Sequence, residues 1–583
     1  MTIFSIAIIF SLFLPSVCFA FKPVARWDVV PYQRIKYGSS MKIGVIAFSK
    51  PGINRVVITP SGQGYSGGAK TVTAMTLNDR TGVYEYWTTL SAGEFTGNGA
   101  ITVSAVVYDN DNNSRSLSLS LIVEGASAYS PKVAWVDATR GNDSTGTVGN
   151  QSAPYRTIGA AVAAAQTANG GSSNGNIIYL QEGTYSVSGV SANTSSEWLT
   201  ITKSATADRS KVIINTGQLR TGYLKYDSVT LQSRGSGLWV ATEASTRLWT
   251  NNCRKIGSGR WVSGSNPVSY SDFDNHYSTN TFTYNVDYAY NRMALVRGAE
   301  IVSIGNDAFE NTPFIVNTTL TDSSNGPTTW HNDAFQIHTT GTPPPDNRIV
   351  YNYKATDLGY EGFFMRSDAG QATDNAFVNV LVEMREPPDE SEQGVVFSPL
   401  MMNQGTWDHL IIWNCTFTLG TSSLNATHTN SSIVGNVFWQ FLHEGTAVGD
   451  PNPAHSEPGN TNGNEYLYNH YMYVYGQGSF CTGYEGYPSN WPCPQWYAKR
   501  PDSHPTGSAT IGGGVIDLKD PSLASFGAPV ANSVLIDRIP FVKVPADLYG
   551  NPRIGKSDIG AIEASFSESP PDAISVPADF QLK

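Results

Sequence analysis

Short apolar segments, each interrupted after a few residues by Gly, Asn, Asp or Ser, make up most of the chain after residue 170. This pattern predicts β-strands joined by tight turns, and no long stretch has the apolar spacing of an amphipathic helix. Several segments end in asparagine, at 347–352, 375–379, 408–414 and 432–436. Asparagine tolerates the left-handed backbone of a tight turn, and its side chain can bond to the asparagine of the next turn. We therefore expect these asparagines to be structural.

Three similar strings of five residues lie within 305–364: GNDAF at 305–309, HNDAF at 331–335 and YEGFF at 360–364. Their alignment places the acids in one column and phenylalanines in another, with offsets of 26 and 28 residues: Asp307, Asp333 and Glu361, and Phe309, Phe335 and Phe363. A repeat of this length built from short strands predicts a stacked coil, with one turn of the coil per repeat. Equivalent positions then lie one strand spacing apart, about 4.8 Å. We expect a ladder of internal phenylalanines and a row of carboxylates.

Residues 21–125 have a different organisation. Strand-like segments at 40–48, 55–59, 83–88, 100–108 and 117–123 are separated by turn clusters such as DNDNN at 109–113. This spacing predicts a compact β-sandwich. The pattern resembles the immunoglobulin-like modules that precede many secreted enzymes, and that resemblance implies a spacer without chemistry of its own.

The next unit begins with the segment WVDATRGND at 135–143, followed by APYRTI at 153–158 and a predicted alanine-rich helix at 158–166. An apolar strand at 176–180 and the turn EGTY at 182–185 come next. This order resembles the beginning of a right-handed parallel β-helix of the pectin-lyase-like superfamily, in which the helix covers the open end of the coil. A cover is needed because a terminal turn exposes unpaired backbone groups and apolar surface. The phrases DLYGNPR at 547–553 and DIGAIE at 558–563 resemble the closing segment of such proteins.

The expected fold is therefore all-β, with a small β-sandwich at 21–125 followed by a right-handed parallel β-helix at 132–565. Residues 444–500 are rich in Asn, Pro, Tyr and Trp, and they are predicted to form a long loop or insert over the coil. The segment 566–583, rich in Pro and Ser at its start, is expected to be a flexible tail.

Composition and charge narrow the functional classes. The net charge of −11 argues against nucleic-acid binding, which needs clustered Lys and Arg. Residues 1–20 have an apolar stretch, Pro15, and the small residues Cys18 and Ala20 before Phe21, which predicts a signal peptide. No later segment is long and apolar enough to span a bilayer. A secreted or cell-surface location follows.

Four cysteines remain beyond residue 20. Cys481 and Cys493 bracket an aromatic loop, and a disulfide between them is expected in an oxidising compartment. Cys253 and Cys415 lie in strand-like segments, where buried thiols are expected. No CxxC pair or His/Cys spacing suggests zinc.

We expect the chemistry beside the aligned strings. Side chains on a strand alternate between the inside and the outside of a coil. With Phe335 and Ile337 inside, Ala334, Gln336 and His338 face outward. On the next turn the corresponding outward residues are Phe364 and Arg366, so His338 and Arg366 should be neighbours.

The three aligned acids stand at the starts of these strands, where the turn can direct them outward. His331 lies two residues before Asp333, and Trp330 and Tyr360 are candidates for stacking on a sugar ring. The predicted catalytic residues are therefore His338, Arg366, Asp333, Glu361 and His331, and the predicted substrate-binding residues are Trp330, Tyr360 and Gln336. Turn acids can equally serve only the backbone.

Two carboxylates one turn apart repel each other unless a cation lies between them or one of them holds a proton. One hypothesis is that Asp307, Asp333 and Glu361 hold calcium, because calcium prefers hard oxygen ligands. A carboxylate pair for glycoside hydrolysis is a second, since adjacent turns approach the separation of a retaining pair. The third is lyase chemistry on a uronic acid polymer, with an Arg or cation on the substrate carboxylate, His338 as base and an acid for the leaving oxygen.

The superfamily resemblance implies polysaccharide lyases, glycoside hydrolases, esterases, epimerases and non-catalytic adhesins. The motif sets of polygalacturonases and pectate lyases are absent here, so the resemblance reaches the fold and not an activity. The expected partner is an extracellular polysaccharide. We take lyase activity on an acidic glycan as the first hypothesis, hydrolase activity as the second and carbohydrate binding without catalysis as the third.

Overall fold

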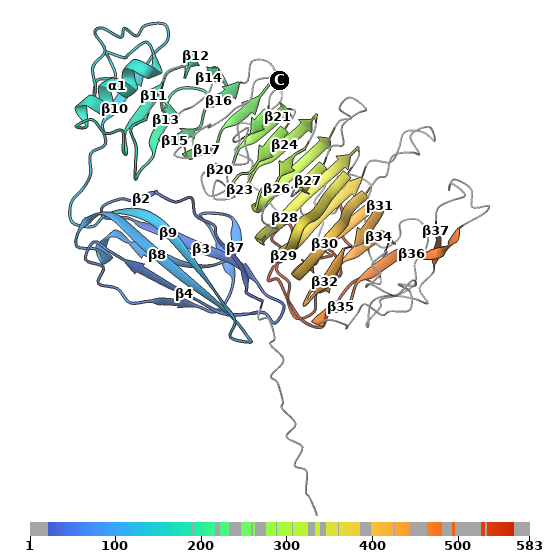
Figure 1. Ribbon diagram of the computed structural model, residues 1–583. Coiled ribbons are helices and arrows are strands. Elements are labelled where there is room, and N and C mark those ends of the chain that lie inside the picture. Colours follow the sequence, from blue (N-terminus) through green and yellow to red (C-terminus); the bar gives the residue numbers. More distant parts are fainter. Residues whose placement is uncertain are drawn as a thin grey trace, which may run out of the picture.

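A computed structural model of the chain describes residues 21–564 apart from 188–189, 191, 216–221, 233–246, 258–259, 263–275, 287, 306, 324–332, 339–345, 360, 385–397, 425, 443–462, 481–491, 496–525, 531–532 and 534. A β-sandwich lies alongside a long coil of parallel strands (Figure 1). The predicted fold class is confirmed. Among the described residues, the helices are too short and too weakly apolar to cross a bilayer.

The sandwich consists of two mainly antiparallel sheets. One has the order β1 (Val24–Trp27), β3 (Ser40–Phe48), β7 (Val83–Ser91), β6 (Thr76–Asn78). The other has the order β2 (Arg34–Ile35), β9 (Ser114–Glu124), β8 (Asn98–Asp109), β4 (Ile53–Ser61), β5 (Lys70–Val72), with β2 parallel to β9. Along β8, Ile101, Val103 and Ala105 are buried while the residues between them are exposed, so one face of the strand forms core. All five predicted strand segments lie within β3, β4, β7, β8 and β9, and the likeness to immunoglobulin modules stays an expectation.

The coil begins with the predicted cover. Strand β10 (Val133–Val136) pairs in parallel with β11 (Ile177–Leu180), and α1 (Ile158–Ala168) lies between them in sequence. Thr157 caps α1 by accepting a hydrogen bond from the Ala160 N–H, and Asp143 accepts from the Arg156 and Thr157 N–H groups. The buried face of α1 is Ile158, Ala161, Val162 and Ala165. The helix therefore shields the apolar end of the coil, as the sequence predicted.

The turns of the coil contribute strands to three parallel ladders, which we call A, B and C, and among the described residues ladder C begins only at β19. Ladder A contains β10, β11, β13 (Leu199–Lys203), β15 (Tyr223–Asp227), β17 (Arg247–Asn251), β20 (His276–Thr279), β23 (Leu295–Arg297), β26 (Phe314–Ser323), β28 (Asp346–Leu358), β29 (Glu361–Met384), β30 (Ser398–Trp413), β33 (Ser432–Val434) and β35 (Glu465–Leu467). Ladder B contains β12 (Gly183–Ser186), β14 (Val212–Asn215), β16 (Thr230–Gln232), β18 (Arg254–Ile256), β21 (Phe282–Val286), β24 (Glu300–Ile304), later parts of β26, β28 and β29, β31 (Thr416–Leu424), β34 (Val437–Leu442) and β36 (His470–Phe480).

Ladder C contains β19 (Arg260–Val262), β22 (Tyr288–Asn291), β25 (Phe309–Glu310), β27 (Asp333–His338), the first parts of β29 and β30, and the last parts of β31, β34 and β36. The short β32 (Thr427–Thr429) pairs with the middle of β30, and β37 (Pro492–Gln495) pairs antiparallel with β36. Two short 3-10 turns, Ala92–Glu94 and Arg209–Lys211, complete the described elements.

Asparagine turns the corner between ladders A and B. Asn317, Asn352, Asn379 and Asn414 all have left-handed backbone, with φ between 45° and 54°. Asn352 Nδ2 donates to Asn317 Oδ1 and Asn379 Nδ2 to Asn352 Oδ1, each at 2.9 Å. The predicted structural role is therefore confirmed for Asn352 and Asn379. At the predicted Asn436 corner, Gly435 takes the left-handed position instead.

The sandwich packs against the outward side of ladder A. Phe48 meets Tyr351 and Trp413 edge-on, with ring centroids 5.4 and 6.1 Å apart. Within this interface Arg297 Nη1 lies 2.6 Å from Asp28 Oδ1, and both side chains are almost fully buried. The sandwich is thus docked on the coil through apolar and ionic contacts, and it is not a free spacer.

The closing segment folds back across the A–B corner of the later turns. Asn379 Nδ2 donates to the Ala546 carbonyl at 2.8 Å, and the Gly560 N–H donates to the Gly435 carbonyl at 2.8 Å. Leu548 and Ile562 pack on Leu381. This segment therefore covers the side of the coil.

The coil continues further than the sequence indicated. Residues 465–480, placed in the predicted loop 444–500, form β35 and β36 and pair in register with β33 and β34. Strand β35 was missed because Glu465 and Tyr466 interrupt its apolar pattern, although Asn469 follows this strand closely. Tyr466 is fully buried, and His428 Nε2 contacts its hydroxyl. The predicted signal peptide 1–20 and tail 566–583 lie outside the described residues.

Candidate functional site

The aligned strings lie on ladder C in the predicted register. Asp333 pairs with Glu361, Phe335 with Phe363, and His338 with Arg366. Glu310 pairs with Gln336, a register that places Asp307 beside Asp333. The expectation that Asp307, Asp333 and Glu361 occupy equivalent positions on successive turns is therefore confirmed. The phenylalanine ladder is also present, with Phe335 and Phe363 ring centroids 5.1 Å apart.

The three acids are buried, which corrects the expected outward display. Residue exposure is 5% for Asp307, 0% for Asp333 and 8% for Glu361. Each of them shares the strand alternation of the internal phenylalanine two residues further on. Asp307 Oδ1 accepts a hydrogen bond from the Asp333 N–H at 3.1 Å, so part of the row serves the backbone. The roles assigned to these acids stay predictions.

Asp333 nevertheless reaches the outward side of ladder C. Its Oδ2 accepts a 2.7 Å hydrogen bond from Gln336 Nε2, and Gln336 alternates with the internal Phe335. Gln336 stands in register with Glu310 on one side and Phe364 on the other, and both of these are half-buried. The carboxylate of Asp333 therefore lies at the margin of this outer column.

Arg366 is half-buried, and it occupies an outward alternate position one turn from His338. Ala334, also expected to face outward, is fully buried. Glu310 was missed from the sequence. Extending the alignment by one column, so that Phe309-Glu310 falls beside Phe335-Gln336 and Phe363-Phe364, would have found it.

Several predicted residues cannot be placed in this geometry. Trp330, His331 and Tyr360 lie outside the described residues, and for His338 only the backbone position is described. Cys481 lies outside them as well, so its disulfide with Cys493 stays a prediction. Cys253 and Cys415 are buried thiols, as predicted.

A cation site is not evident in the described part of the chain, where no group of three or more His, Cys, Asp or Glu is arranged to hold a metal ion. Asp307 and Asp333 already accept hydrogen bonds from protein donors. Calcium therefore stays a prediction.

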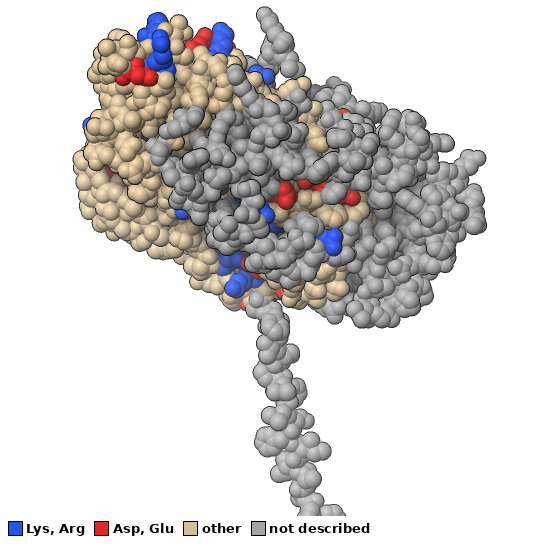
Figure 2. Space-filling view, turned by 45° about the horizontal axis from the view of Figure 1, so that its top comes forward, with Lys and Arg blue, Asp and Glu red and all other residues tan. Residues whose placement is uncertain are grey.

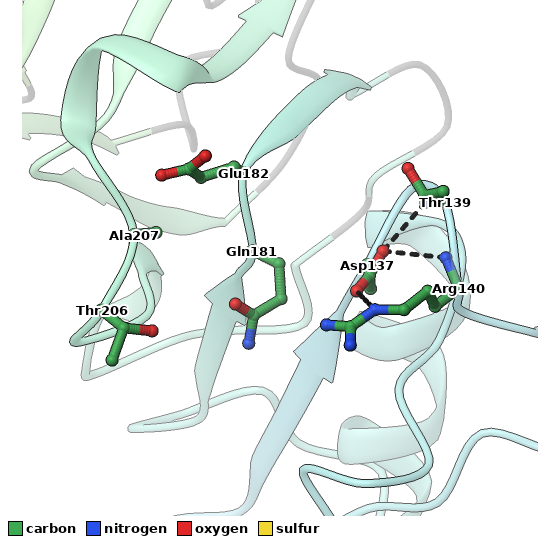
Figure 3. Close-up of a pocket in the computed structure, with 7 residues that line it drawn as sticks. All are labelled: Asp137, Thr139, Arg140, Gln181, Glu182, Thr206 and Ala207. Carbon is green, nitrogen blue, oxygen red and sulfur yellow. Dashed lines mark hydrogen bonds and ion pairs between the residues drawn. The ribbon is translucent and has the colours of Figure 1, made fainter.

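A second candidate is a pocket of about 320 Å³ at the corner between ladders A and B in the first turns (Figure 3). Asp137 and Arg140 follow β10, Gln181 and Glu182 follow β11, and Thr206 follows β13. Figure 2 shows basic and acidic side chains gathered together at the end of the molecule where α1 lies. The sequence had assigned Asp137 and Arg140 only to the opening phrase of the coil.

The Asp137 carboxylate is held by hydrogen bonds at one side of this pocket. Its Oδ1 accepts from the Thr139 and Arg140 N–H groups at 2.9 Å each, and its Oδ2 accepts from Arg140 Nε at 2.8 Å. Burial pushes the pKa of Asp137 upward, but the hydrogen bonds from Arg140 and Thr139 together hold that pKa below its ordinary value. The carboxylate is therefore ionised and orients the guanidinium.

Comparison with known proteins adds little. No family model matches the chain, and no curated protein matches it. Among solved structures, it is similar to the family 28 exopolygalacturonase of Yersinia enterocolitica, at 11% identity and a TM-score of 0.29, over 72% of this chain and 98% of that chain. A likeness at this level carries no argument about activity, so the function has to be argued from the site.

Proposed function

We propose that this protein degrades a polysaccharide and that its reaction is β-elimination on a uronate-containing glycan. The observation that carries the proposal is the register of His338 with Arg366 on ladder C, with Arg366 at an outward, half-buried position. The corrected burial of the three acids favours this reading over one that needs two exposed carboxylates.

In the proposed reaction Arg366 binds the uronate carboxylate through two parallel hydrogen bonds. This neutralisation makes the neighbouring C5–H more acidic, and His338 removes the C5 proton. The electron pair forms a C4–C5 double bond while the C4–O bond breaks. The leaving oxygen takes a proton from an acid, for which Asp333, Glu361 and His331 are the candidates. Trp330, Tyr360 and Gln336 would position the sugar.

Glycoside hydrolysis is the second candidate, and one observation favours it. Asp333 and Glu361 pair on adjacent turns, so their carboxyl groups start from backbone positions about 5 Å apart, close to a retaining pair. The two reactions differ in water: hydrolysis adds it across the broken bond, and elimination does not.

Products decide between these candidates. The full chain is incubated with uronate-containing and neutral polysaccharides, and both ultraviolet absorbance and reducing ends are followed. Elimination predicts new reducing ends together with absorbance from unsaturated ends. Reducing ends without absorbance would establish hydrolysis instead. Retained binding without either signal would overturn both and leave carbohydrate binding alone. Parallel reactions with a chelator test the calcium prediction.

A further inference from the structure

The pocket at the first A–B corners contains hydrogen-bond donors that the protein does not use. Within the described part of the chain, neither terminal nitrogen of Arg140 has a protein partner, because only its Nε bonds to Asp137. Gln181 receives the Ser204 hydroxyl on its Oε1 at 3.1 Å, which leaves its Nε2 free. Figure 3 shows the Arg140 guanidinium directed toward Gln181, while the Gln181 carboxamide is directed toward Thr206 on the far side of the pocket.

The opposite side of the pocket offers an acceptor. Glu182 Oε1 accepts the Asp208 N–H at 3.2 Å, and Lys211 Nζ lies 3.7 Å from its Oε2. These contacts hold the Glu182 carboxylate in place while leaving lone pairs for a ligand hydroxyl. Among the described residues that line the pocket none is aromatic, so a ligand would be recognised by its polar edges.

The Asp137–Arg140 pair makes the site partly preformed. The Asp137 side chain is 5% exposed and accepts three hydrogen bonds, whereas the Arg140 side chain is 78% exposed. A guanidinium held through its Nε presents its two terminal nitrogens as a planar fork, the geometry that matches a carboxylate. Less side-chain entropy is then lost when a ligand binds.

We propose that this pocket binds one uronic acid residue of an acidic oligosaccharide, with the sugar carboxylate on Arg140 and the sugar hydroxyls on Gln181 and Glu182. The volume of about 320 Å³ is at the small end of ligand sites, which fits a single sugar residue. A ligand that was only an anion would face Glu182 without a donor for it, whereas a uronic acid offers both a carboxylate and hydroxyls. The substrate class rests on the proposed function, but the site is separate from ladder C.

The test measures binding by calorimetry in the full chain carrying His338→Ala and Arg366→Gln, so that cleavage and ladder C binding are suppressed. The probes are a uronic acid oligomer and the same oligomer with its carboxyl groups reduced to alcohols. Adding Arg140→Gln should weaken uronate binding about 10-fold or more, the scale of losing charged hydrogen bonds. The reduced oligomer should bind the parent about 10-fold more weakly for the same reason. The matched control Arg156→Gln removes an exposed arginine outside the pocket and should change nothing.

Glu182→Gln provides a variant that leaves the Asp137–Arg140 pair intact, and it should weaken binding about fivefold. Unchanged binding in folded Arg140→Gln and Glu182→Gln variants would overturn the site. Equal affinity for the two oligomers would overturn the assigned carboxylate contact. Arg140-dependent binding by a chain whose wild type cleaves no glycan would contradict the proposed function and leave this site standing.

Discussion

On ladder A the outward positions carry large apolar side chains, whereas on ladder C the described outward positions include polar and charged ones. Tyr351 and Trp413 point away from the coil interior and are buried because the sandwich covers them. Gln336 and Arg366, on ladder C, retain some exposure. A strand that is apolar on both faces, such as 410–413, is therefore the signature of a face covered by another unit. The outer face of ladder C has polar side chains instead, and the proposed function places the ligand there.

The largest loss of stability is expected when a large side chain on the covered face of ladder A is truncated. Trp413→Ala should lower the free energy of unfolding by about 3–5 kcal/mol, because it removes a buried ring against Phe48 and leaves a cavity. Urea unfolding measures the change. Trp135→Ala is the control, since that ring is half-buried on ladder A outside this cluster and should cost clearly less. Equal losses would mean that the sandwich contact adds nothing.

The buried ion pair of the same interface gives the next effect. Arg297→Ala should destabilise by about 3 kcal/mol, because it leaves Asp28 buried without its partner. The exposed pair Lys42–Asp79 is the matched control, and Lys42→Ala should cost at most about 1 kcal/mol. Similar values for the two variants in urea unfolding would contradict the assigned burial.

On the polar face, substitutions should affect turnover and leave stability unchanged. His338→Ala should lower the rate of elimination about 100-fold, the scale of losing a general base. Arg366→Lys should also impair the reaction, because a point charge does not replace a fork. Arg156→Lys is the control for the change of side chain. Near-normal rates in folded His338→Ala and Arg366→Lys proteins would place the site elsewhere.

A further effect is a pH dependence that originates beside the covered face. Burial, with Asp28 nearby, raises the pKa of Glu85 to about 8. The folded state then holds a proton that the unfolded state loses near its ordinary pKa, so this stability is complete at low pH and is lost as pH rises toward 8. Glu85→Gln should remove this slope in urea unfolding between about pH 5 and pH 9. An identical slope in wild type and variant would show that another group titrates.

The sequence was sufficient for features that follow from a local rule. Phe335 and Phe363, the corner asparagines Asn352 and Asn379, and the α1 cover each follow from a local rule of alternation, turn chemistry or capping, and they are present. The burial of Asp333 agrees with its alternation with Phe335, two residues further on, and it was missed because the turn was expected to direct the carboxylate outward. Strand β35 was missed for a different reason: the buried Tyr466 is made acceptable by His428, which is 38 residues away in sequence.

In the coil, the register of the strands stays constant while the connections between ladders B and C differ in length. Four residues connect ladder B to ladder C between Ile304 and Phe309, and nine connect them between Ser323 and Asp333, yet Glu310 and Gln336 remain in register. Closing a longer loop costs little additional entropy, so connections of different length are compatible with one scaffold. Connections of different length could therefore be exchanged between turns without redesigning a strand pairing.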